Sequence, residues 1–221
     1  MNKVVVITGA NRGIGFSFCQ YYLSKGYQVY GVCRQSSVVL DSLGVIVVAG
    51  VDISVAGDIE KLQVSLAGVR IDLLINNAGV LRDESLDGLN FDTIQQQFEV
   101  NALGPLRVTD ALLANLSSGS KIALISSRMG SVEDNCSGGR YGYRMSKSAL
   151  NIAGKSLAMD LKGRGIAVAI LHPGLVGTDM IGGVGDITPD QAVKRLAGCI
   201  EGLDLSNTGS FWHSNGEVLP W

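Results

Sequence analysis

The first 26 residues restrict the fold most strongly, because a buried strand, a glycine-rich turn and a helix follow one another there. Val4–Ile7 is a short, apolar, β-branched run, typical of a strand inside a parallel sheet. Gly9, Gly13 and Gly15 follow, and then a helical pattern that Gly26 closes. Backbone N–H groups and the helix dipole at such a turn attract a phosphate. The segment therefore predicts a dinucleotide site, although a purely structural βα turn has the same pattern.

Strand and helix patterns alternate along the rest of the chain. The expected strands are Gln28–Cys33, Val45–Gly50, Asp72–Ile75, Lys121–Ser126, Ile166–Leu171 and Gly209–His213. Helical patterns lie between most of them, which indicates right-handed βαβ crossovers. We therefore expect an α/β fold: a Rossmann-like, doubly wound parallel sheet in a three-layer sandwich, with residues 1–221 forming a single domain.

Three later segments give more specific expectations. A long helix is expected from about Phe91 to Leu116, with one apolar face made of Ile94, Phe98, Ala102, Leu106, Thr109, Leu113 and Leu116. A second helix is expected over Tyr141–Lys162, and a last one opens at Thr188 with a capping box. The Asn215-Gly216 pair predicts a turn that folds the C-terminal tail back on the sheet edge.

Composition excludes several classes of protein. The net charge is −2, so no overall basic field would attract nucleic acid. The four cysteines are widely separated along the chain, which indicates reduced thiols rather than a metal site. The two histidines are too few for most zinc sites. No apolar run approaches the length of a bilayer span, and the N-terminus enters a strand directly. We expect a cytoplasmic protein with no membrane or nucleic-acid partner.

The segment YGYRMSK places a phenol and an ammonium four residues apart, at Tyr143 and Lys147. Residues at this spacing share a helix face. A cation beside the phenol favours its ionised form, so Tyr143 is a candidate proton donor and acceptor. Tyr141 precedes the lysine by six residues and falls off that face. The pair alone also fits an ordinary exposed helix face.

Five motifs in order resemble the short-chain dehydrogenase/reductase family over nearly the whole chain. They are TGxxxGxG at Thr8–Gly15, NNAG at Asn76–Gly79, an asparagine at Asn101, a strand-end serine followed by YxxxK, and a PG loop at Pro173-Gly174. Within the family, the ending FWHSNGEVLPW most resembles C-factor-like, sniffer-type carbonyl reductases. The resemblance implies an NADP-dependent oxidoreductase that reduces an aldehyde, ketone or quinone to an alcohol, with a tyrosine as general acid.

The same resemblance implies the site residues. The catalytic set is Asn101, Ser127, Tyr143 and Lys147, with Ser126 an alternative to Ser127. The expected cofactor-binding residues are Gly9, Asn11, Arg12, Gly13, Ile14, Gly15, Arg34, Asp52, Ile53, Asn77, Ala78, Gly79, Tyr143, Lys147, Pro173, Gly174, Val176 and Thr178. Lys147 would lower the pKa of the phenol, and Asn101 would hold a water that relays protons to it.

Charge favours NADPH (NADP⁺) over NADH. An NAD site needs a carboxylate about 20 residues past the glycines, to bind the ribose 2′-hydroxyl. No Asp or Glu occurs from Met1 to Leu40, whereas Arg12 and Arg34 fall where a 2′-phosphate would lie. The alternative is that both arginines are solvated surface charges.

The substrate is the least specified part. The segment from Gly177 to Thr188 is short and glycine-rich, which predicts an open pocket for a small-molecule carbonyl compound. Its expected lining is Met129, Met145, Met180 and Ile181. The two long helices form the family's usual dimer face, so a homodimer is possible. A dinucleotide-binding sensor or signalling protein with incidental catalysis is the alternative function.

Overall fold

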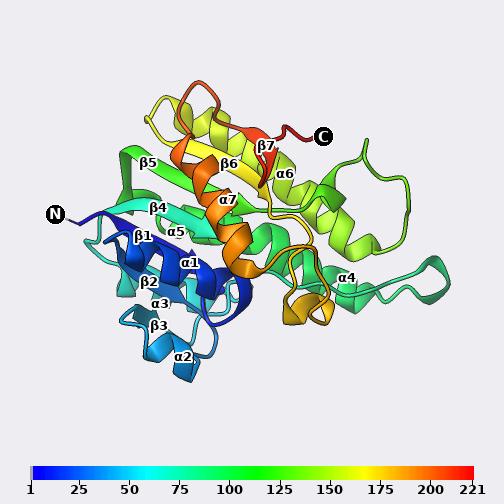
Figure 1. Cartoon of the computed structure of the whole chain (residues 1–221), viewed down its shortest axis with the longest axis horizontal. Coiled ribbons are helices and arrows are strands. Elements are labelled where there is room, and N and C mark those ends of the chain that lie inside the picture. Colours follow the sequence, from blue (N-terminus) through cyan, green and yellow to red (C-terminus); the bar gives the residue numbers. More distant parts are fainter. Residues whose placement is uncertain (1) are drawn as a thin grey trace.

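The computed structural model describes residues 2–221, which form a seven-stranded parallel sheet between two layers of helices (Figure 1). The strand order is β3-β2-β1-β4-β5-β6-β7, and every neighbouring pair is parallel. The strands are β1 Val4–Thr8, β2 Gln28–Val32, β3 Ile46–Val48, β4 Ile71–Asn76, β5 Leu116–Ile125, β6 Ala167–His172 and β7 Ser210–His213. The expected α/β class and doubly wound sheet are confirmed.

The order of the strands determines where a ligand can bind. The chain moves outward from β1 to β2 and β3, then returns to pair β4 with the other side of β1. Loops leaving the carboxyl ends of β1 and β4 therefore diverge and leave a crevice between them. Both the glycine turn and the NNAG motif lie at these two strand ends.

Helices α1 and α7 cover one face of the sheet, and α3, α5 and α6 cover the other. In Figure 1, α1 and α7 lie side by side in front of the strands, and α6 runs behind them. The helices are α1 Gly13–Ser24, α2 Val38–Asp41, α3 Ala56–Ser65, α4 Phe91–Phe98, α5 Gly104–Ala111, α6 Tyr141–Lys162 and α7 Pro189–Glu201. Thr188 caps α7 in a capping box with Gln191, as expected.

Alternate residues of each strand supply the two halves of the core. Val5 and Ile7 pack with Phe18 of α1 and Leu196 of α7. Val6 points the other way, into the cluster that contains side chains of α3, α5 and α6. Because both faces of the central strands are covered, β1 is buried throughout and apolar from Val4 to Ile7 rather than alternating.

The prediction of one long helix from Phe91 to Leu116 is wrong in where the helix ends and in which residues form its apolar face. The helical run is interrupted by a π-helical turn at Glu99–Leu103, and α5 ends at Ala111. A π turn adds a residue and rotates everything after it, so the face predicted from a uniform period does not persist. Leu106 is therefore exposed, while Gln97 and Asn101 are buried. Leu116 begins strand β5 instead of ending the helix.

The C-terminal tail folds back on the edge strand β7, as expected. Gly216 adopts a φ of 92°, and the N–H of Leu219 donates to the carbonyl of Phe211 at 2.8 Å. The Trp221 ring stacks on that of Phe211, with centroids 5.5 Å apart. The carbonyl oxygen of Trp221 accepts N–H bonds from Val132 and Glu133, which joins the tail to the segment before α6.

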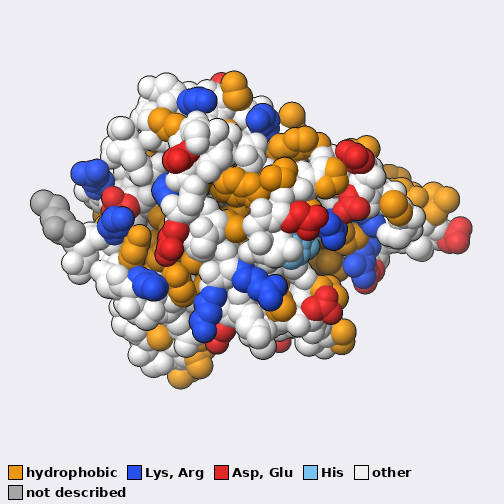
Figure 2. Space-filling model, turned by 45° about the horizontal axis from the view of Figure 1, so that its top comes forward, with side chains coloured by type: hydrophobic (Ala, Val, Ile, Leu, Met, Phe, Trp, Pro, Cys, Tyr) orange, Lys and Arg blue, Asp and Glu red, His pale blue; other side chains and the backbone are white. Residues whose placement is uncertain are grey.

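Among residues 2–221, every helix is too short or too polar to cross a bilayer. In the view of Figure 2, acidic and basic side chains are interspersed. The four cysteines are free thiols, and Cys19 and Cys33 are buried. Within the described part of the chain, no cluster of three or more His, Cys, Asp or Glu side chains could hold a metal ion.

Candidate active site

The glycine turn after β1 is compact enough that two of its positions require glycine. Gly9 has a φ of 68°, and a Cβ there would lie 2.9 Å from the Cα of Ala78. A Cβ on Gly15 would lie 2.1 Å from the carbonyl oxygen of Gly9. The turn thus packs against both the following helix and the end of β4, and it leaves the N-terminus of α1 open to the crevice.

Thr8 and Asn77 bind the glycine turn to the end of β4. The Thr8 hydroxyl accepts the N–H groups of Asn77 and Ala78 at 3.0 and 3.1 Å. The side-chain amide of Asn77 donates back to the Thr8 carbonyl at 3.0 Å. These reciprocal bonds keep the two sides of the crevice at a fixed separation, which explains why both motifs need these polar residues.

A cleft of about 1110 Å³ lies at the carboxyl edge of the sheet, where the crevice was expected. It is lined by most of the predicted cofactor residues, namely Gly9, Asn11, Arg12, Gly13, Ile14, Arg34, Asp52, Ile53, Asn77, Ala78, Gly79, Tyr143, Lys147, Pro173 and Thr178. Gly15, Gly174 and Val176 are not part of its wall. Gly15 packs inside the turn, a Cβ on Gly174 would face Ile187 and His213, and Val176 is buried.

Both predicted arginines are exposed at the cleft and weakly paired. Arg12 lies 3.8 Å from Asp179, and Arg34 lies 3.7 Å from Asp52. Asp52 also accepts hydrogen bonds from the backbone and the hydroxyl of Ser54, which fixes its carboxylate. Exposed ion pairs of this length contribute little, so the guanidiniums remain available to an anionic ligand.

Tyr143 and Lys147 lie one turn apart on α6 and both line the cleft. The Lys147 ammonium donates to the carbonyl of Ile125 at 2.8 Å and lies 5.7 Å from the Tyr143 ring centroid. Burial lowers the pKa of Lys147 to about 8. Burial also raises the pKa of Tyr143, while a hydrogen bond with Ser127 and the charge of Arg140 oppose that rise.

The groups that shift the pKa of Tyr143 do not include Lys147, so the expected effect of the lysine on the phenol stays a prediction. Desolvation is the largest effect on the phenol, and the opposing effects come from Ser127 and Arg140. Both members of the pair are removed from water, which raises the pKa of the phenol and lowers that of the ammonium.

The two adjacent serines have different surroundings. Ser126 donates its hydroxyl to the side chain of Asn151 at 2.5 Å. Ser127 faces Tyr143, and its hydroxyl accepts the N–H of Met129 at 3.2 Å. Consecutive residues at a strand end point to opposite sides, so only one hydroxyl can lie beside the phenol. Ser126 lines the main cleft, whereas Ser127 is the serine hydrogen-bonded to the phenol, so the choice between them stays a prediction.

Asn101 lies in the π-helical turn and is fully buried. Its amide accepts from the N–H of Val80 and donates to the carbonyl of Val80, both at 2.8 Å. It also donates to the hydroxyl of Ser146 at 3.0 Å, the residue before Lys147. Asn101 thereby links the loop after β4 to the helix that carries the tyrosine and lysine.

Comparison with known proteins agrees with this arrangement. The family model of the short chain dehydrogenases matches residues 3–187. The chain belongs to this family. Two solved structures of this family resemble it along its full length: an NADPH-bound carbonyl reductase from chicken fatty liver (TM-score 0.91, 30% identity, 100% and 99% of the two chains covered) and the carbonyl reductase Sniffer of D. melanogaster (TM-score 0.91, 28% identity, 100% of both). The carbonyl-reductase type is confirmed.

Two further proteins are similar to this chain in sequence, and neither is named a carbonyl reductase. The 1-hydroxy-2-glutathionyl-2-methyl-3-butene dehydrogenase of Rhodococcus sp. (strain AD45) is 37% identical over 225 residues, which cover 99% of this chain and 100% of the relative. The C-signal of Myxococcus xanthus is 42% identical over 154 residues, covering 68% of this chain and 93% of the relative.

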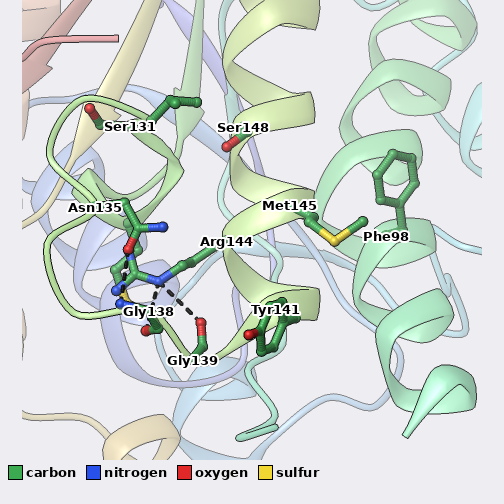
Figure 3. A pocket seen from close by; sticks show the side chains of 11 residues that line it. Phe98, Ser131, Asn135, Gly138, Gly139, Tyr141, Arg144, Met145 and Ser148 are labelled. Carbon is green, nitrogen blue, oxygen red and sulfur yellow. Dashed lines mark hydrogen bonds between the residues drawn. The ribbon is translucent and has the colours of Figure 1, made fainter. Parts of the chain in front are cut away.

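Of the expected substrate-pocket residues, only Met180 lines the main cleft of this dehydrogenase-family fold. Met129 and Met145 line a second pocket of about 420 Å³ between α4, α6 and the segment before α6 (Figure 3). In Figure 3, Arg144 points into that segment and donates to the carbonyls of Gly138 and Gly139. The lining of this second pocket also includes Phe98 and Tyr141.

Sequence reasoning missed a buried carboxylate beside the site. Glu84 is 4% exposed and accepts hydrogen bonds from Thr93, Gln97 and the backbone N–H of Gly142. Gly142 is the second residue of α6, so Glu84 caps the helix from a distant loop, at the end where negative charge is favourable. No motif marks it in the sequence.

Proposed function

We propose that this chain is an NADPH-dependent reductase that converts an aldehyde, ketone or quinone to an alcohol. The observation that carries the proposal is that Tyr143 and Lys147 line one cleft together with the glycine turn, while Ser127 is hydrogen-bonded to the phenol. The NADPH in the similar chicken carbonyl reductase structure supports the choice of cofactor.

The residues of the cleft fit a dinucleotide. Side chains are absent where the glycine turn crowds β4, and the open N-terminus of α1 suits a pyrophosphate. When bound, NADPH would supply a hydride to the carbonyl carbon. The rest of the proposal concerns what this chain's own residues do.

Tyr143 is the proton donor in this proposal. A tyrosine phenol is protonated at neutral pH, so Tyr143 can give its proton to the carbonyl oxygen as negative charge develops there. The Ser127 hydroxyl donates a hydrogen bond to the same oxygen. Lys147 supplies positive charge beneath the phenol, and Asn101 holds the loop after β4 against α6.

Oxidation of an alcohol uses the same groups in reverse, with Tyr143 as the base. The name of the Rhodococcus relative describes that direction. A glutathionyl alcohol and its carbonyl product are therefore candidate ligands of this chain as well.

The deciding experiment follows NADPH and NADH oxidation with a panel of aldehydes, quinones and diketones, for wild type and Tyr143→Phe. We expect turnover with NADPH that falls at least tenfold in the variant, since general acid catalysis contributes roughly 10²–10⁴-fold. A Tyr143→Phe enzyme that keeps more than a tenth of wild-type turnover contradicts the scheme.

The preference for NADPH is tested at the two arginines. The double variant Arg12→Gln/Arg34→Gln should raise KM for NADPH by about tenfold or more, because two charged hydrogen bonds to a 2′-phosphate are removed. KM for NADH should change little. Equal effects on both cofactors contradict the assignment.

A second candidate function is that of a dinucleotide-binding signalling protein, which the similarity to the C-signal favours. Such a protein would bind NADPH tightly and turn over no carbonyl at a useful rate. Fluorescence titration of NADPH, together with the turnover panel, separates the two functions.

We also propose a homodimer through α4, α5 and α6. Met145, Ile152 and Met159 recur at seven-residue intervals on α6 and are more than half exposed. This apolar stripe has the spacing of a helix-packing seam. Light scattering during size-exclusion chromatography should give twice the chain mass, and Ile152→Glu should yield the monomer.

A further inference from the structure

An arginine without an acidic partner lines the active-site cleft. Arg82 lies in the loop after β4 and is exposed. It donates to the adjacent carbonyl of Leu81 at 2.9 Å, and no acidic side chain among residues 2–221 lies within ion-pair distance of it. The proposed reduction gives this residue no role.

A second arginine, Arg140, is the N-cap residue of α6, three residues before Tyr143, and has a strained backbone conformation. Arg140 has a φ of 50°, and no other non-glycine residue among 2–221 has a positive φ. Side chains adopt this region at a cost, and such residues cluster at functional sites. The side chain is 44% exposed; its Nε donates to Asp83, and its Nη1 lies 3.8 Å from the sulfur of Met129. Its charge reaches Tyr143, whose pKa it lowers.

A buried polar network fixes the backbones of both arginines. The side-chain oxygen of Gln97 accepts the N–H of Arg82 at 2.9 Å. The backbone carbonyl of Glu84 accepts the N–H of Arg140 at 2.8 Å. Gln97 in turn donates to the Glu84 carboxylate at 2.6 Å, and both side chains are buried. The two guanidiniums are therefore carried on a common rigid base rather than on independent loops.

We propose that Arg82 and Arg140 select substrates that carry a carboxylate, which they bind at the entrance while Tyr143 acts on the carbonyl group. This inference rests on the proposed reductase function and adds the substrate class. The chemistry suits it, because a guanidinium binds carboxylate in planar, bidentate fashion. Asp83 binds Nε of Arg140, and Nη1 has only a long contact with the Met129 sulfur, which a carboxylate could replace when it binds the two Nη groups. Asp92 also lines the cleft and sets a repulsive limit to where the carboxylate can lie.

The test compares two aldehydes of the same shape, 4-formylbenzoate and 4-formylbenzamide, with NADPH at low salt. Wild type should show a kcat/KM ratio that favours the carboxylate by about fivefold or more, a modest figure because both arginines are partly solvated. The double variant Arg82→Gln/Arg140→Gln should abolish that preference. Intrinsic aldehyde reactivity cancels when the two ratios are compared. Arg140→Lys, which keeps the charge, should retain part of the preference.

Arg70→Gln is the matched control, because Arg70 is an exposed arginine just before β4, at the opposite edge of the sheet. The ratio of kcat/KM for the two aldehydes should be the same in Arg70→Gln as in wild type. In 0.5 M salt, screening of the charges should lower the wild-type ratio. Turnover of both aldehydes with no carboxylate preference, or with a preference that survives in the double variant, overturns the substrate class and leaves the reductase function standing. No turnover of either aldehyde or of any compound in the panel of aldehydes, quinones and diketones overturns both.

Discussion

Replacement of Glu84 by alanine should be unusually destabilising for a loop residue. Its carboxylate accepts three hydrogen bonds in a buried position, but the three donors lose unequal amounts. The Thr93 hydroxyl keeps the carbonyl of Asn90 as an acceptor, and the Gln97 amide keeps the carbonyl of Thr93. The N–H of Gly142, in the first turn of α6, has no second acceptor among the described residues.

These contacts determine how much Glu84→Ala should lower the free energy of unfolding. An orphaned buried N–H costs about 1–3 kcal/mol, and the two replaceable bonds together add about 1 kcal/mol. The total is about 3 kcal/mol. For a chain of this size each kcal/mol lowers Tm by about 2–4 °C, so Tm should fall by about 6–12 °C.

Thermal unfolding followed by circular dichroism measures the effect, and Glu60→Ala is the control, because Glu60 is an exposed glutamate on α3. The control should shift Tm by no more than about 2 °C. Glu84→Gln should lie between the two, since an amide keeps one acceptor and loses the charge at the helix N-terminus. If Glu84→Ala unfolds within 2 °C of wild type, the capping role assigned to Glu84 is refuted.

Three further predictions concern single residues. Reductive kcat/KM should fall as pH rises through about 8, where Lys147 loses its proton. In Lys147→Arg this fall should occur at a higher pH. If the pH of the fall is unchanged, another group causes it. Burial lowers the pKa of His172 to about 3, below its unfolded value, so its contribution to stability is present above pH 6.5 and is lost as pH falls towards 3. That loss is about 2 kcal/mol between pH 7 and 5, and urea titrations should show it in wild type but not in His172→Gln. Gly154→Ala should destabilise, because its Cβ would lie 2.6 Å from Ile170, whereas Gly57→Ala on α3, with open space around it, should stabilise by about 0.5–1 kcal/mol; the same sign in both denaturant curves contradicts the packing argument.

The sequence predicted those parts of the fold that depend on local pattern. β1, the glycine turn and the capping box of α7 follow from residue types within a few positions of each other. The error from Phe91 to Leu116 arose because a π turn leaves no compositional signature. The apolar residues Leu112, Leu113 and Leu116 also suit a helix or a strand equally, so the start of β5 depends on its pairing with β4.

The candidate site also has features that the sequence predicts and features that it does not. Motif residues could be placed in one cleft from the sequence, because the carboxyl ends of parallel strands meet at one edge. The electrostatics of Tyr143 could not, since desolvation depends on burial that no spacing reveals. Glu84 and Arg82 were also missed, as both lie in a loop whose position is set by the distant side chain of Gln97.

These differences have a common physical origin in how the two ends of the cleft are built. At the cofactor end, backbone groups and short side chains link adjacent strand ends directly, as Thr8 does with Asn77. At the substrate end, the entrance depends on a chain of longer contacts from Gln97 through Glu84 to Arg140. A substitution in the first set would disturb the sheet itself, whereas one in the second changes the loops and leaves the sheet intact. The loops at the entrance can therefore vary while Tyr143 and the glycine turn stay in place.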